Sequence, residues 1–151
     1  LGDIAGSSFL DLFSGSGVVG LEALSRGASS VTMVERERAK RATIQSNLER
    51  VLGSLDLVPE VAIVTAPVER FLLRVRSTFD FVYIDPPFDY RHKDDLLRRL
   101  SSSGALGSEC RIMLHYPREE RIHPGPLRVI DERRYGRSLL LFLAQADSKS
   151  A

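Results

Sequence analysis

The most specific chemical feature of the sequence is Asp85-Pro86-Pro87-Phe88, at the end of a predicted strand over 80–85. Two successive prolines fix φ near −65° and offer no N–H, so they hold a turn rigid. The residue before each proline is confined to extended backbone, which predicts that the Asp85 carboxylate and the Pro86 carbonyl point outward. Two acceptors beside the flat Phe88 ring suit an exocyclic amine on a stacked nucleobase. A turn without function is the alternative.

A glycine-rich loop lies upstream, with Gly15, Gly17 and Gly20 in the spacing G-x-G-x-x-G. This spacing is typical of loops that bind dinucleotides, in which the backbone approaches the ligand and the next helix offers unpaired N–H groups. Asp11 precedes the loop, and a carboxylate there repels a pyrophosphate and favours a cation such as the ammonium or sulfonium of S-adenosylmethionine. Alternatively, Asp11 caps the helix that follows.

Glu35 falls 20 residues after Gly15, at the end of the next β-rich run. An acid at that place accepts hydrogen bonds from both hydroxyls of a ribose. Such an acid suits a dinucleotide and an adenosine equally, so Glu35 predicts only that the ligand contains a nucleoside. Asp11 favours a nucleoside ligand with positive charge.

Short apolar runs alternate with helical segments, which predicts an α/β fold with a parallel sheet and helices on both faces. We predict strands over 8–13, 30–35, 61–66, 80–85 and 110–116, and helices over 18–27, 36–52, 67–76 and 93–102. Segments 127–136 and 138–144 lie too close together for a crossover helix, so they should form an antiparallel hairpin at the sheet edge. The sequence therefore predicts a mostly parallel seven-stranded sheet.

Ligands of open α/β sheets bind outside the carboxyl ends of the strands. The motifs above lie at such ends, as do residues 66–68. We therefore expect residues 11–17, Glu35, 66–68 and 85–88 to surround one site.

Length and composition limit the class of protein. The 151 residues, 43% of them hydrophobic, fit one globular domain over 1–146 with a frayed polar tail over 147–151. The single cysteine, Cys110, excludes an intramolecular disulfide, suits a reducing compartment and is expected in the core. No apolar run approaches the roughly 20 residues that span a membrane, and no signal peptide is visible, so we expect a cytoplasmic protein.

The excess of Lys and Arg lies after residue 88, which hints at a polyanionic partner, with an ordinary solvated surface as the alternative. The stretch from Tyr90 to Lys93 falls on a predicted rim loop and offers contacts for RNA or DNA phosphates, with a solvated loop as the favoured interpretation of any single residue. His115 and His123 have no metal-ligand spacing with Cys110, so no metal site is predicted.

These motifs closely resemble the bacterial 16S ribosomal RNA (guanine-N(2))-methyltransferase D family. The likeness rests on FLDLFSGSGVVGLEALSRGASSVTMVE and VYIDPPF and extends to the hairpin RRYGRSLLLFLA, so it covers nearly the whole chain. It implies a Rossmann-like class I methyltransferase fold with S-adenosylmethionine as the methyl donor. It also implies a monomer that methylates the N2 amino group of a guanine in 16S ribosomal RNA, within a small-subunit particle.

The resemblance also implies roles for individual residues. The methionine part of the cofactor is cradled by Asp11, Phe13, Gly15 and Gly17, the ribose is held by Glu35, and the guanine amine is presented by Asp85, Pro86, Pro87 and Phe88. Arg36 and Val68 complete the predicted cofactor-binding set. Pro67 stands where the family has an Asp or Asn that contacts the adenine amine, so adenine recognition should fall to backbone around Val68. The family has a basic segment before its first strand, which we expect to be absent from this chain.

Three other functions compete with this interpretation. An adenine or cytosine amino-methyltransferase acting on DNA or another RNA is the nearest, because DPPF-like turns serve that chemistry too. An NAD-dependent oxidoreductase fits the glycine spacing but leaves DPPF without a role. A non-catalytic RNA-binding domain is the third.

Overall fold

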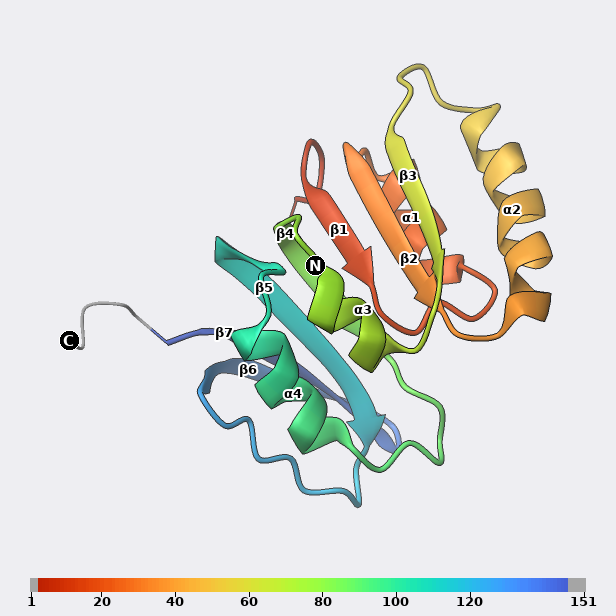
Figure 1. Cartoon of the computed structure of the whole chain (residues 1–151). Helices are drawn as coiled ribbons and strands as arrows, with labels where there is room; N and C mark the ends of the chain where they lie inside the picture. The colour runs from red at the N-terminus through yellow and green to blue at the C-terminus, as the bar shows by residue number, and fades with distance from the viewer. Residues whose placement is uncertain (1–2, 147–151) are drawn as a thin grey trace.

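The computed structural model describes residues 3–146, so the predicted polar tail at 147–151 lies outside the described residues. One seven-stranded sheet runs through the molecule in the order β3-β2-β1-β4-β5-β7-β6 (Figure 1). Its strands are β1 (Ser8–Asp11), β2 (Ser30–Glu35), β3 (Glu60–Thr65), β4 (Phe79–Ile84), β5 (Leu106–Pro117), β6 (Leu127–Tyr135) and β7 (Ser138–Gln145). The helices are α1 (Val18–Ser25), α2 (Arg38–Leu52), α3 (Val68–Arg74) and α4 (Lys93–Ser102).

The first five strands pair in parallel, and the last two run antiparallel. Strand β7 lies between β5 and β6, so the hairpin of β6 and β7 joins the sheet through β7 and leaves β6 at the edge. The prediction of a mostly parallel seven-stranded sheet with a C-terminal antiparallel hairpin is confirmed.

Helices cover both faces of the sheet, as predicted. Leu72 of α3 and Leu96, Leu97 and Leu100 of α4 are buried against one face, where α3 and α4 lie in front of the strands in Figure 1. On the other face, a second buried cluster takes in residues of α1 and α2, among them Leu24, Ile44 and Leu48. The two clusters hold the sheet between them and leave its carboxyl edge open for loops.

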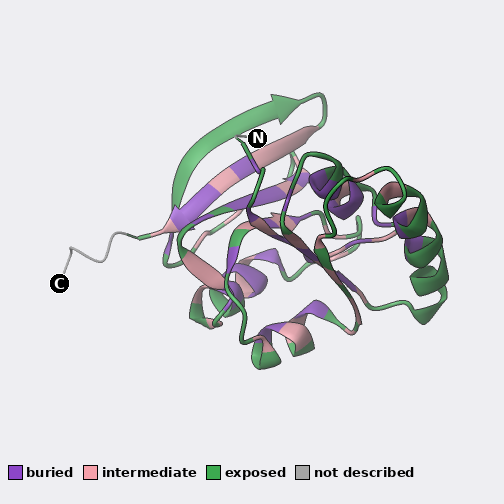
Figure 2. Cartoon of the chain, turned by 90° about the horizontal axis from the view of Figure 1, so that it is seen from above, coloured by how far each residue is buried: buried purple, intermediate pink, exposed green. Residues whose placement is uncertain are grey.

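One glycine allows a close approach of helix to sheet, and the edge strand of the sheet is exposed. Gly20 brings α1 so near β2 that an added Cβ would stand 2.7 Å from Cγ of Met33. The edge strand β6 buries only Leu127, and it appears almost wholly green in Figure 2. Cys110 is in the core, as predicted. Between residues 3 and 146, no helix has the length and apolar character needed to cross a membrane.

Candidate active site

A hollow of about 680 Å³ opens at the carboxyl edge of the sheet, where the loops after β1, β2, β3 and β4 meet. This volume lies in the range of sites for small molecules and cofactors. Seven of the eleven residues predicted for the site line it: Phe13, Gly15, Glu35, Arg36, Val68, Asp85 and Pro87. The remaining four, Asp11, Gly17, Pro86 and Phe88, are not among its lining residues.

Glu35 ties together the two loops that form one wall of the hollow. Its Oε1 accepts a hydrogen bond of 2.9 Å from the N–H of Gly15, and its Oε2 accepts one of 2.8 Å from the N–H of Glu37. Each carboxylate oxygen can accept a further bond, because an ionised carboxylate has about four lone-pair sites. Glu35 is therefore oriented in advance and keeps acceptor capacity for hydroxyl groups of a ligand.

Gly15 leaves the space above this wall open. Its φ of +57° is a conformation that L side chains rarely adopt, and no heavy atom lies within 4 Å of the place where a Cβ would stand. The backbone of the glycine-rich loop can therefore be approached closely by a ligand.

Asp11 lies beneath the loop rather than in the hollow. It is only 1% exposed, and neither carboxylate oxygen accepts a hydrogen bond of good geometry. Burial raises the pKa of Asp11 from 3.8 to about 7, outweighing the lowering effect of the nearby Ser14 hydroxyl and the backbone of Gly20 and Phe13, and the negative charge of Asp85 adds to the rise. The interpretation of Asp11 as the cap of the next helix is wrong, because Gly17 is the N-cap residue of α1 and no side chain caps the helix. An orphaned buried carboxyl is costly and gains from a nearby cation.

Gly17 supports the loop from below. Its φ is +89°, and a Cβ there would lie 3.3 Å from Cγ2 of Ile44 and 3.4 Å from Sδ of Met33. This glycine lets α1 begin directly above the core, which explains why it does not line the hollow.

The Asp85 to Phe88 turn forms the opposite wall. Asp85 and Pro87 line the hollow, whereas the Phe88 side chain is 89% exposed beside it. A large aromatic ring left in solvent at the mouth of a hollow is available for stacking on a planar ligand. The turn therefore offers a carboxylate facing inward and an aromatic ring at the rim.

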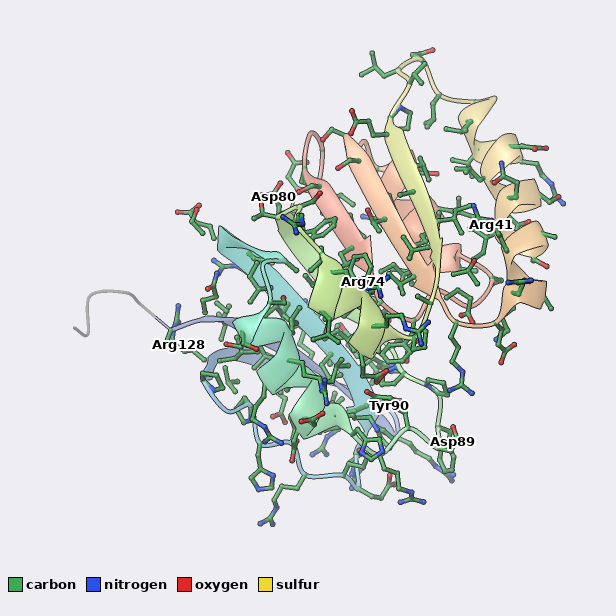
Figure 3. The ribbon with its side chains drawn as sticks, in the orientation of Figure 1. Arg41, Arg74, Asp80, Asp89, Tyr90 and Arg128 are labelled. Atoms are coloured by element: carbon green, nitrogen blue, oxygen red, sulfur yellow. The ribbon has the colours of Figure 1, made fainter. Side chains whose placement is uncertain are left out.

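Tyr90 was predicted only as a rim residue, but the structure ties it into the wall. Its O–H donates a hydrogen bond of 2.8 Å to Oε2 of Glu69 in α3, and its ring meets the edge of Phe13 at 5.1 Å between centroids. In Figure 3, Tyr90 lies on the loop between β4 and α4, close to the beginning of α3. Burial and the bond to Glu69 raise the pKa of Tyr90, so it stays a neutral donor.

Lys93 does not lie on the rim loop, where the sequence placed it as a candidate contact for phosphates. Lys93 is the first residue of α4 and only 3% exposed. Its Nζ donates to the carbonyl of Tyr90 at 2.7 Å and to Glu120 at 2.9 Å. Arg91 and His92, by contrast, are exposed and line the hollow.

The hollow is acidic. Its lining includes five carboxylates against three basic side chains: Glu35, Glu37, Glu69, Asp85 and Asp89 against Arg36, Lys40 and Arg91. Burial, together with the charges of Asp85 and Asp11, raises the pKa of the neighbouring Tyr83 to about 12. This balance favours a ligand with positive charge over a dianionic pyrophosphate.

A second side chain that the sequence did not single out for this site is His115 of β5. Its Nδ1 lies 3.0 Å from Oδ1 of Asp85. No group of three or more His, Cys, Asp or Glu side chains within 3–146 is arranged to hold a metal ion.

The family model described as Conserved hypothetical protein 95 matches residues 2–144. The chain belongs to this family. Ribosomal RNA small subunit methyltransferase D of Escherichia coli (strain K12) is 31% identical over 109 residues, which are 72% of this chain and 52% of that protein. The resemblance to the methyltransferase D family is therefore confirmed, and the chain spans about half the length of that curated relative.

Solved structures show the same fold. The methyltransferase candidate yhhF of Escherichia coli is 27% identical with a TM-score of 0.80, over 94% of this chain and 77% of that chain. The ribosomal protein L11 methylase of Lactobacillus delbrueckii is 17% identical with a TM-score of 0.74, over 93% of this chain and 70% of that chain. The fold is thus the Rossmann-like fold of class I methyltransferases, as predicted.

Proposed function

We propose that this chain transfers a methyl group from S-adenosylmethionine to the N2 amino group of a guanine in 16S ribosomal RNA. One observation carries the proposal: the glycine-rich loop with Glu35 and the Asp85 to Phe88 turn face each other across a single acidic hollow. One wall offers acceptors for a nucleoside, and the other offers an acceptor and an aromatic ring for a nucleobase amine. The name of the Escherichia coli relative supports ribosomal RNA of the small subunit as the substrate.

The residues present fit S-adenosylmethionine. The orphaned carboxyl of Asp11 lies under the loop and gains from a positive charge, and the space above Gly15 admits a ligand. Glu35 has free acceptor sites for two ribose hydroxyls, while Arg36 and Val68 flank the part of the hollow that the adenine would enter. Pro67 also lines this part and has no side-chain acceptor, so backbone near Val68 would recognise the adenine.

When bound, S-adenosylmethionine supplies a methyl group on a positively charged sulfur that is a good leaving group. The chain's own residues position the acceptor. Asp85 and the Pro86 carbonyl would accept hydrogen bonds from the two hydrogens of the guanine amine, so that the nitrogen lone pair points away from the turn. Phe88 would stack on the base. After transfer, Asp85 or water takes the proton that the nitrogen loses, so no stronger base is required.

An NAD-dependent oxidoreductase is disfavoured by the same geometry. A pyrophosphate would meet an acidic hollow with Asp11 beneath its loop, and Asp85 and Phe88 would have no role. We further propose that the substrate is a small-subunit particle and that the chain acts as a monomer in the cytoplasm.

The test has two steps. Calorimetric titration with S-adenosylhomocysteine and with NAD should show binding of the first alone. The full chain is then incubated with tritiated S-adenosylmethionine and 30S particles from a bacterial strain that lacks its methyltransferase D, and the RNA is digested for mass spectrometry. We expect N2-methylguanosine. Methylated adenine or cytosine would favour the other amino-methyltransferases, and binding of the cofactor without transfer would favour an RNA-binding domain.

A further inference from the structure

His115 and Asp85 are held together by the register of two neighbouring parallel strands. Ile84, the last residue of β4, pairs with Leu114 of β5, so the next residue of each strand stands side by side. Nδ1 of His115 lies 3.0 Å from Oδ1 of Asp85, within hydrogen-bond distance. An ionised carboxylate only accepts hydrogen bonds, so the imidazole Nδ1–H is the donor.

The two members of this pair differ in their access to the hollow. Asp85 lines it, whereas His115 is not among its lining residues. Within residues 3–146, the bond from His115 is the one hydrogen bond seen at the Asp85 carboxylate. Oδ1 is therefore engaged on the side of β5, and Oδ2 remains without a partner.

His115 is a firm anchor for this bond. The backbone of β5 pairs with β4 on one side and with β7 on the other, where His115 stands opposite Leu140. Its chain neighbours Leu114 and Tyr116 are both buried. Asp85, by contrast, lies past the last residue of β4, although the two side chains are exposed to a similar extent, 35% for His115 and 44% for Asp85. A half-exposed carboxylate of this kind can occupy several rotamers, and a donor on a paired strand selects one of them.

We propose that His115 is the positioning residue of the methyl-transfer site: its Nδ1–H fixes Oδ1 of Asp85 and so directs Oδ2 to the nucleobase amine. This inference rests on the proposed function, because it takes Asp85 as the acceptor for that amine. Because His115 does not line the hollow, it would contact neither cofactor nor base. We therefore expect His115 to affect the rate of methyl transfer and not the binding of cofactor, and to do so only through Asp85.

Two substitutions of His115 separate the hydrogen bond from the bulk of the ring. His115→Leu removes the donor, whereas His115→Asn places an amide N–H near the position of Nδ1. A hydrogen bond to a charged group that orients a reacting centre is worth roughly a tenfold to hundredfold change in rate. We expect kcat for RNA methylation to fall at least about tenfold in His115→Leu and to stay within about threefold of the parent in His115→Asn. The dissociation constant of S-adenosylhomocysteine should be unchanged in both.

A double substitution tests whether His115 acts through Asp85. In an Asp85→Ala background, His115→Leu should cause no further loss of rate, because the carboxylate that it orients is gone. Tritium counting over long incubations gives the sensitivity that these slow variants need. An equal loss in both backgrounds would overturn the proposal, as would a His115→Leu variant at the parent rate or a failure of His115→Asn to recover activity.

The chain provides a matched control in His123. Its Nδ1 lies 3.0 Å from Oδ2 of Asp94, the same pair at the same distance, but between the β5–β6 loop and α4. His123→Leu should leave kcat within about twofold of the parent. A loss equal to that of His115→Leu would mean that breaking any histidine–aspartate pair slows the chain, and it would overturn the specific role of His115.

A spectroscopic reading needs no RNA. In the chain labelled with ¹⁵N-histidine, His115 should carry its proton on Nδ1 in the parent and shift toward the Nε2 form in Asp85→Ala. An Nε2–H tautomer in the parent would overturn the proposal whatever the RNA assay shows.

The identity of the methylated base tests the proposed function separately. A product other than N2-methylguanosine refutes that function, while the ratio of variant to parent rates still decides the role of His115. A parent that methylates no base overturns both.

Discussion

Glu35 acts at the residue scale as a brace and as an acceptor. Its two oxygens hold the N–H groups of Gly15 and Glu37, and the proposed ribose would use their remaining lone pairs. We expect Glu35→Ala to weaken binding of S-adenosylhomocysteine by about 1 to 3 kcal/mol, because two hydroxyls lose a charged acceptor. Isothermal titration measures this. Glu60→Ala, at the opposite end of the sheet on β3, is the control and should bind as the parent does.

Asp11 predicts a pH dependence of stability with a definite sign. Its carboxyl has a pKa of about 7 in the folded chain against 3.8 as the ordinary value, because burial penalises the charged form. Between about pH 4 and pH 7, the Asp11 carboxyl therefore keeps its proton in the folded chain but has lost it in the unfolded chain. The stability from this group is complete below about pH 4 and is lost as the pH rises through about 7. The loss is at most about 4 kcal/mol.

The measurement compares the parent with Asp11→Asn in urea at pH 5 and pH 8, without cofactor. The variant has no carboxyl to ionise at this position. From pH 5 to pH 8, the free energy of unfolding should therefore fall more in the parent than in the variant. A difference between variant and parent that does not change with pH would contradict the buried, unpartnered state of Asp11. At pH 8 the same variant should bind S-adenosylhomocysteine more weakly, because the attraction to its ammonium is lost, and should gain no useful NAD binding.

For single residues, the sequence predicted which residue types stand at the ends of the strands, but it did not predict how deeply each side chain is buried. Glu35 is the last residue of β2 and Asp85 is the first residue after β4, so both lie at the carboxyl edge of the sheet beside the hollow. Asp11 was expected to meet the ligand directly, but it is buried, since it is the last residue of β1 in the middle of the sheet. The contact of His115 with Asp85 spans 30 residues and depends on strand register, which no local pattern reveals.

At the scale of elements, periodicity and the length of connections located every strand and helix that the structure has within residues 3–146, and the errors were at their ends. Strand β1 stops at Asp11 rather than residue 13, because the glycine-rich turn begins there. Strand β5 begins at Leu106 rather than residue 110. Its first residues include Gly107 and Ser108, which have low strand propensity, and the pairing with β4 carries an irregularity between Phe79 and Phe81. Turn chemistry thus shortened one strand, and tertiary pairing lengthened another.

The junction between the β4–α4 loop and α4 predicts a measurable difference between two lysines. Lys93 is buried and holds both the Tyr90 carbonyl and Glu120, so Lys93→Met should lower the free energy of unfolding by about 1 to 3 kcal/mol. Lys40 forms an exposed pair with Glu37 at 3.5 Å, so Lys40→Met should change it by less than about 0.5 kcal/mol. Urea unfolding of both variants checks this. Equal effects would mean that the buried pair adds nothing to the loop's anchorage.

For the whole molecule, the order of the strands divides the site into two halves. Strands β1, β2 and β3 lie together on one side, and Gly15, Glu35 and Val68 stand at or just beyond their carboxyl ends. Strands β4 and β5 lie on the other side and supply Asp85 and His115. The hollow lies where the chain order of the strands reverses, between β1 and β4, which is the usual ligand site of open α/β sheets. Cofactor binding and substrate presentation should therefore be separable by mutation.

Asp85→Ala tests this division. The substitution removes an acceptor on the β4 side of the hollow and leaves Glu35 and the glycine-rich loop intact, so S-adenosylhomocysteine should bind within about threefold of the parent. Loss of a positioned acceptor that acts mainly in the transition state costs on the order of 10² to 10³ in rate, so methyl transfer to 30S particles should fall at least about a hundredfold. Glu35→Ala is the counterpart and should reverse the pattern, with weakened cofactor binding and near-parent transfer at saturating cofactor. Near-parent transfer by Asp85→Ala would remove the Asp85 to Phe88 turn from the chemistry, and an equal loss of cofactor affinity in both variants would show that the two halves do not act separately.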